Sequence, residues 1–166
     1  MMPRGLVVVS VAVLVTFASA TVAWANSTTF ISATFSEPAQ VNFHSGCAAF
    51  PEGFCGTGEV KPFGQATETI EFGAGCGGTC DLRTITLAEG QLFLEETAVS
   101  DCPTDSCHHG PIEVVTATLT DVVVGGTGLF EGATGELTGT VSGAVSNARP
   151  AGGSAVQLAG TIHYDP

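Results

Sequence analysis

Basic residues are scarce in this sequence. Four lysines and arginines stand against sixteen aspartates and glutamates, and the formal net charge of the 166 residues is −12. A phosphate backbone would repel such a chain, so nucleic-acid binding is excluded. The length is enough for one domain and excludes a multidomain enzyme.

Tryptophan and tyrosine are almost missing as well. The chain has one of each, Trp24 and Tyr164. A transmembrane β-barrel carries girdles of these residues at both membrane interfaces. We therefore expect a soluble protein outside the cytoplasm, which its negative charge keeps dispersed.

The N-terminus has the pattern of a secretory signal. A short basic segment containing Arg4 precedes an apolar run from Leu6. The run ends in two A-x-A sites, at 18–20 and 23–25, which a signal peptidase accepts. We expect a signal-peptide helix over residues 1–25 that is cleaved near Ala25, and a single domain over 26–166. An uncleaved signal-anchor is the competing interpretation, because the run is long enough to span a bilayer.

Six cysteines in a small secreted chain predict three disulfides, for which fifteen connectivities are possible. They fall into three local groups in glycine-rich or polar segments, and we prefer pairing within each group: Cys47 with Cys55, Cys76 with Cys80, and Cys102 with Cys107. The alternative is a metal site, because two thiols and two imidazoles, Cys102, Cys107, His108 and His109, lie within eight residues. An oxidising compartment favours disulfides, so we predict no metal or other cofactor.

After residue 25 no segment shows sustained helical periodicity, whereas alternation of apolar and polar residues recurs. Residues 137, 141 and 145 share one face with two glycines, and 115–120 separates an apolar face from a threonine face. We predict strands at 29–35, 40–43, 66–72, 83–87, 91–98, 115–120, 136–145 and 156–164, and loops at 45–64, 73–81 and 100–111. Glycines on inward faces favour a closed, antiparallel eight-stranded barrel with disulfide-bearing loops.

A glycine-rich segment separates two of these strands, and its key residues are Gly125, Gly126, Gly128, Phe130, Gly132 and Gly135. A strand rather than a helix follows, so it is not a phosphate-binding loop. Its glycines supply positive-φ positions and bulges for a wide connection, and Phe130 can fold under and plug one end of the barrel.

This segment resembles a motif of the bacterial secreted relatives of allene oxide cyclase and dirigent-like barrels. The resemblance extends over residues 121–164, which include the strands on either side of the segment. The resemblance implies an eight-stranded barrel, a possible trimer, and a cavity for hydrophobic molecules that guides cyclisation or radical coupling in some branches. The matched motif is structural, so no catalytic residue is carried over.

Two carboxylates fall in the apolar register. Glu68 shares a face with Ala66 and Ile70, and Glu96 shares one with Leu92 and Leu94. A buried carboxyl has a raised pKa and can act as a general acid or stabilise a carbocation. We favour the simpler interpretation, in which each lies at the barrel mouth with its carboxylate in water.

The sequence favours a non-enzymatic secreted barrel that is structural or binds a small apolar ligand. The alternatives are a dirigent- or cyclase-type guide of cyclisation or coupling, and metal binding through the 102–109 loop.

Overall fold

The structure is a computed structural model that describes residues 27–38, 40–41, 53–100, 108–109, 112–146 and 153–166. The predicted signal peptide lies outside these residues. Within the described ranges, no helix is long and apolar enough to cross a membrane.

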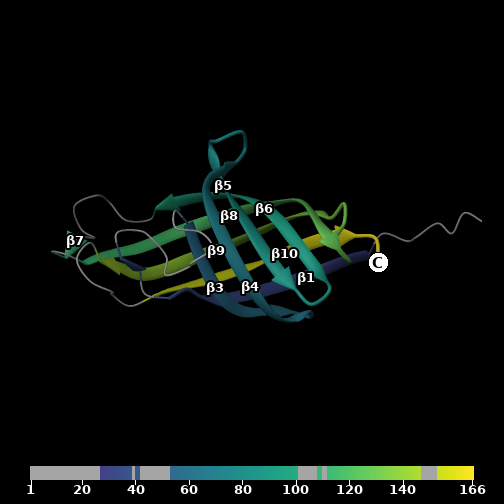
Figure 1. Ribbon diagram of the computed structural model, residues 1–166, viewed down its shortest axis with the longest axis horizontal. Helices are drawn as coiled ribbons and strands as arrows, with labels where there is room; N and C mark the ends of the chain where they lie inside the picture. Colours follow the sequence, from purple (N-terminus) through teal and green to yellow (C-terminus); the bar gives the residue numbers. More distant parts are fainter. Residues whose placement is uncertain (1–26, 39, 42–52, 101–107, 110–111, 147–152) are drawn as a thin grey trace, which may run out of the picture.

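The described chain is all-β, as predicted. Its strands are β1 (Ser27–Ser36), β2 (Gln40–Val41), β3 (Gly53–Lys61), β4 (Gly64–Gly75), β5 (Cys80–Leu87), β6 (Gly90–Ser100), β7 (His108–His109), β8 (Ile112–Gly128), β9 (Thr134–Ser146) and β10 (Ser154–Tyr164). Eight long strands pair antiparallel in the order β9-β10-β1-β3-β4-β5-β6-β8, and pairing of β8 with β9 closes the barrel. The predicted eight-stranded barrel is therefore confirmed, and Figure 1 shows the strands wrapping around a common interior.

The strand expected at 40–43 is present at 40–41 as β2, which adds to β9 outside the closed ring. Residues 42–43 lie outside the described residues. Two predicted loops contain strands: the short β7 lies within the loop expected at 100–111. The loop expected at 45–64 contains β3, which pairs with both β1 and β4. Its glycines look like turn residues but serve close packing: a Cβ on Gly58 would lie 2.8 Å from the Phe35 side chain.

The end of the barrel near the C-terminus is closed by aromatic side chains. Phe130 is fully buried, and its ring centroid lies 5.1 Å from that of Phe63 and 5.7 Å from that of Tyr164. Here we call these three residues the aromatic plug. Below it the interior is filled by aliphatic side chains that include Ile31, Ile85, Leu92, Leu137 and Leu158.

The glycine-rich segment forms the β8–β9 connection beside this plug. Gly125, Gly128, Gly132 and Gly135 have positive φ, and a bulge opposite Phe93 and Leu94 interrupts the β6–β8 register. Gly125, Gly126 and Gly128 belong to the end of β8 rather than to the turn itself. A Cβ on Gly126 would lie 2.2 Å from the carbonyl oxygen of Gln91 and 2.8 Å from the Cβ of Phe130, so the missing side chain allows β6 and the turn at Phe130 to approach β8 closely.

Candidate functional site

A pocket of about 190 Å³ opens in the barrel interior toward the end that carries β7. Here we call it the open-end pocket. Most of its wall is apolar, and polar groups come from the inward faces of β5, β6, β10 and the end of β1. It is lined by Glu37, Phe54, Ile70, Phe72, Asp81, Arg83, Glu96, Ala98, Ala117, Leu119, Val141, Gly143 and Ser154.

Beneath the pocket lies a layer of charged side chains, one from each of four neighbouring strands. Glu68 comes from β4, Arg83 from β5, Glu96 from β6 and Asp121 from β8. All four are buried, with exposures of 1%, 1%, 5% and 0% in that order. We call this group the charged layer; it separates the aliphatic core from the pocket.

The guanidinium of Arg83 holds the charged layer together. Its Nη1 donates to Glu68, and its Nη2 and Nε donate to Glu96, the Nε contact being 2.7 Å long. Asp121 lies slightly farther away, with its Oδ1 3.6 Å from Nε. Neither oxygen of Asp121 has a hydrogen-bond partner in this arrangement, and Oε1 of Glu68 has none.

Burial shifts the protonation of these carboxyls. Desolvation raises the pKa of Glu68 to about 7; the charge of Arg83 opposes this shift, and Glu37 and Glu96 add to it. Desolvation likewise raises the pKa of Asp121 to about 8 against the pull of Arg83, and the adjoining Glu96 carboxyl raises it further. Desolvation lowers the pKa of Arg83, but the three carboxylates outweigh it and keep the guanidinium charged.

A further carboxyl, Glu37, lies at the end of β1. It is 3% exposed and accepts a hydrogen bond from the hydroxyl of Ser154 on β10. Desolvation raises its pKa, while the Ser154 hydroxyl and the charge of Arg83 lower it. The backbone N–H of Glu37 also donates to the carbonyl of Ser154, so β1 and β10 are joined at the pocket.

The structure corrects the preferred interpretation of Glu68 and Glu96. Both are buried rather than in water at the mouth, because each strand continues past them toward the open end, to the pocket-lining residues Ile70 and Ala98. Glu96 lines the pocket, whereas Glu68 lies behind Arg83. Sequence reasoning missed Arg83 and Asp121 as interior groups. The signal was present, because Arg83 alternates with Ile85, and Asp121 with Leu119.

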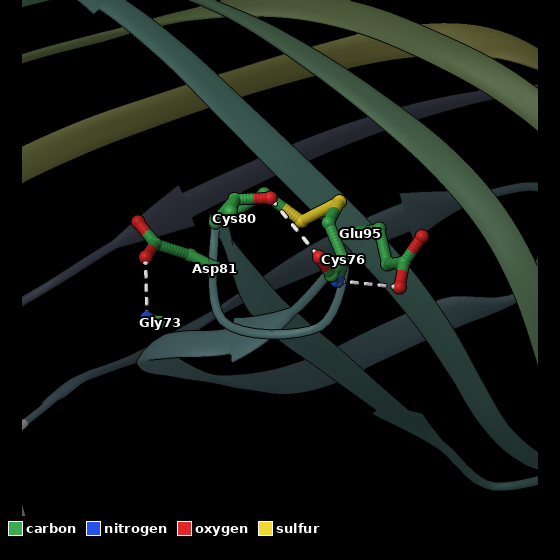
Figure 2. Close-up of a disulfide and its surroundings, with 6 residues drawn as sticks. Gly73, Cys76, Cys80, Asp81 and Glu95 are labelled. Atoms are coloured by element: carbon green, nitrogen blue, oxygen red, sulfur yellow. Dashed lines mark hydrogen bonds between the residues drawn. A yellow bond between two sulfur atoms is a disulfide. The ribbon is translucent and has the colours of Figure 1, made fainter.

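A disulfide fastens the β4–β5 hairpin beside the pocket. Cys76 and Cys80 are bonded, and the N–H of Cys76 donates to Oε1 of Glu95 at 2.7 Å (Figure 2). Asp81, which lines the pocket, accepts a hydrogen bond from the N–H of Gly73 at 2.9 Å. The sulfurs and Glu95 lie close enough to share a metal ion, but as a disulfide the sulfurs are not thiolate ligands.

The other predicted cysteine pairs are only partly described. Cys55 is disulfide-bonded. Cys47, Cys102 and Cys107 lie outside the described residues, and only the backbone of His108 and His109 is described, as β7. The alternative metal site at 102–109 therefore stays a prediction.

Comparisons with protein-family models, with curated proteins and with solved structures found no match to this chain. The case for a function accordingly rests on the pocket and the charged layer.

Proposed function

We propose that this protein binds a small, mainly apolar molecule in the open-end pocket. The observation that carries the proposal is an unfilled, apolar-walled space in a barrel that is otherwise tightly filled. Its volume of about 190 Å³ exceeds the roughly 150 Å³ that holds benzene in an engineered protein cavity. A ligand about the size of one substituted ring fits this space.

Wall chemistry supports this assignment. Phe54 and Phe72 meet edge to face with centroids 4.9 Å apart, and Ile70, Leu119 and Val141 complete an apolar surface. Ligand sites are commonly concave and apolar, with a few polar groups that orient the ligand. Here Glu37, Glu96 and Ser154 provide such groups. The resemblance of 121–164 to barrels with hydrophobic ligands agrees with this proposal.

The test is titration of the purified protein with 2-phenylethanol and indole, followed by NMR. We expect saturable shifts that include the Phe54 and Phe72 rings. Ala117→Leu, which adds side-chain volume at the pocket wall, should abolish them. Ala155→Leu makes the same change on the exposed outer face of β10 and should leave binding intact. If neither compound binds to the unmodified protein, the proposal is overturned.

A second candidate, guidance of a cyclisation or coupling reaction, draws on one observation. A buried carboxyl, Glu96, lines the pocket next to an arginine. It can stabilise positive charge on a reacting molecule. Under this proposal Glu96→Gln abolishes turnover of a cyclising substrate while ligand binding persists. Glu68→Gln should lower turnover less, because Glu68 lies behind Arg83. Equal turnover in the unmodified protein and in both variants would exclude the candidate.

We also propose that the protein functions outside the cytoplasm after cleavage near Ala25. The Cys76–Cys80 disulfide supports an oxidising compartment. Intact mass measurement of the secreted protein tests this, because a mature chain that begins at Asn26 and lacks free thiols is expected. A retained N-terminal segment would instead indicate a signal-anchor.

A further inference from the structure

The polar groups of the open-end pocket are unequal in charge. Three carboxyl side chains, Glu37, Asp81 and Glu96, line it against one guanidinium, that of Arg83. Low-dielectric walls strengthen the field of such groups, so the pocket attracts positive charge.

The hydrogen-bond donors of the pocket are already engaged. Arg83 is 1% exposed and bonds to Glu68 and Glu96. The hydroxyl of Ser154 donates to Glu37. Among the described side chains that line the pocket, these are the two with polar hydrogens besides the carboxyls, and both point at carboxyl oxygens. An anionic ligand would have to displace a bonded carboxylate, at the cost of an unpaired buried charge.

Carboxyl oxygens, by contrast, are in excess. The partner of Glu37 is a neutral hydroxyl, and the carboxyls of Glu37 and Glu96 line the same pocket. A cation bound beside these two carboxyls would neutralise their negative charge. The rings of Phe54 and Phe72 lie in the same pocket, and aromatic faces also attract cations.

We propose that the pocket selects a small apolar amine, whose ammonium group pairs with Glu37 and Glu96 while its hydrophobic body packs against Phe54 and Phe72. This inference rests on the proposed function, because it names the chemical class of the ligand for the same pocket.

Three matched probes test it by calorimetric titration of the unmodified protein at pH 7. They are 2-phenylethylamine, 2-phenylethanol and phenylacetate, which share one ring and differ in the charge of the polar end. We expect the amine to bind about tenfold tighter than the alcohol or better, and phenylacetate to bind weakest. Equal affinity of amine and alcohol, or tightest binding of phenylacetate, would overturn the inference and leave the proposed function standing. Failure of all three to bind would overturn both.

One variant and a matched control test whether the ammonium group pairs with Glu37. Glu37→Gln retains an acceptor for the Ser154 hydroxyl but removes the charge, so amine affinity should fall about tenfold while alcohol affinity stays within about twofold. Glu131→Gln is the matched control, because Glu131 is exposed in the β8–β9 turn at the other end of the barrel. It should change neither affinity. Unchanged amine affinity in folded Glu37→Gln would remove Glu37 from the site and contradict the proposal.

Discussion

Glu96 on β6 and Asp121 on β8 are directly opposed in the sheet, and both carboxyl groups are buried inside the barrel. Like charges at opposed positions destabilise a sheet. Here Arg83 lies beside the pair, bonded to Glu96 and 3.6 Å from Asp121. Because Glu68 shares the same guanidinium, one positive charge faces three carboxyls, and protonation removes part of the excess negative charge.

The stability of the fold should therefore decrease as the pH rises from about 5 to about 8. The pKa values of Glu68 and Asp121, about 7 and about 8, lie above their ordinary values of 4.5 and 3.8. At pH values between the ordinary and the raised pKa of each carboxyl, the folded chain holds a proton that the unfolded chain has released. Each such proton gives a slope of about 1.4 kcal/mol per pH unit. Urea unfolding at several pH values measures it; stability that increases over this range would contradict the prediction.

Asp121→Asn should reduce the slope of stability against pH by the contribution of about one proton, because an amide of nearly the same size does not titrate. The comparison is with Glu131→Gln, which changes the net charge equally from an exposed position. This control should keep the slope of the unmodified protein. A slope that is equal in both variants would show that general charge repulsion, rather than the charged layer, causes the pH dependence.

Arg83→Met should destabilise the barrel by about 3–5 kcal/mol at pH 8, because three buried carboxyls lose their counter-ion. At pH 5 the loss should be smaller, since neutral carboxyls do not need one. Lys61→Met removes the same charge from an exposed site at the end of β3 and should cost about 0.5 kcal/mol or less. Urea titrations of both variants at both pH values test this; an Arg83 effect that is independent of pH would contradict it.

The sequence predicts the inward register well. Alternation placed Leu137 and Val141 on one face, and both point inward in the barrel. It also placed Glu68 and Glu96 among interior residues, but not their depth. Depth depends on how far each strand continues beyond the carboxylate and on which strands adjoin it. Arg83 provides the counter-ion from a neighbouring strand, and the pattern within a single strand does not reveal that neighbour.

Strand β3 shows why composition misleads in this fold. Gly53, Gly56 and Gly58 give the segment the appearance of a loop. In the barrel their missing side chains leave space for neighbouring groups, which only the tertiary arrangement identifies. Propensity scales treat glycine as a strand breaker. In β3 the stability lost by placing glycine in a strand is offset by the close packing of neighbouring groups.

Phe130→Ala should cost about 3–5 kcal/mol, the usual range for loss of a buried aromatic side chain. The variant would open the aromatic plug and change the environment of Tyr164, the one tyrosine in the chain. Thermal unfolding and tyrosine fluorescence measure both effects. Phe30→Ala serves as the control, because Phe30 is 66% exposed, and it should shift stability by about 0.5 kcal/mol or less. Similar costs for both variants would contradict the plug.

Gly56→Ala tests the link between β3 and the charged layer. A Cβ on Gly56 would lie 2.7 Å from Oε1 of Glu68 and 3.1 Å from the carbonyl oxygen of Ser36. Glu68 would have to shift and weaken its bond to Arg83, so we expect a loss of about 1–3 kcal/mol.

The same change in a Glu68→Ala background should cost clearly less, because the crowded carboxylate is gone. Such a double-mutant cycle isolates the coupling between the two positions. Gly58→Ala provides the contrast: its Cβ would meet the carbonyl oxygen of Thr34 at 1.9 Å, a backbone contact that does not involve Glu68. Its cost should therefore be the same in both backgrounds. If Gly56→Ala also cost the same in both backgrounds, the space at Gly56 would not be what accommodates the Glu68 side chain in the barrel interior.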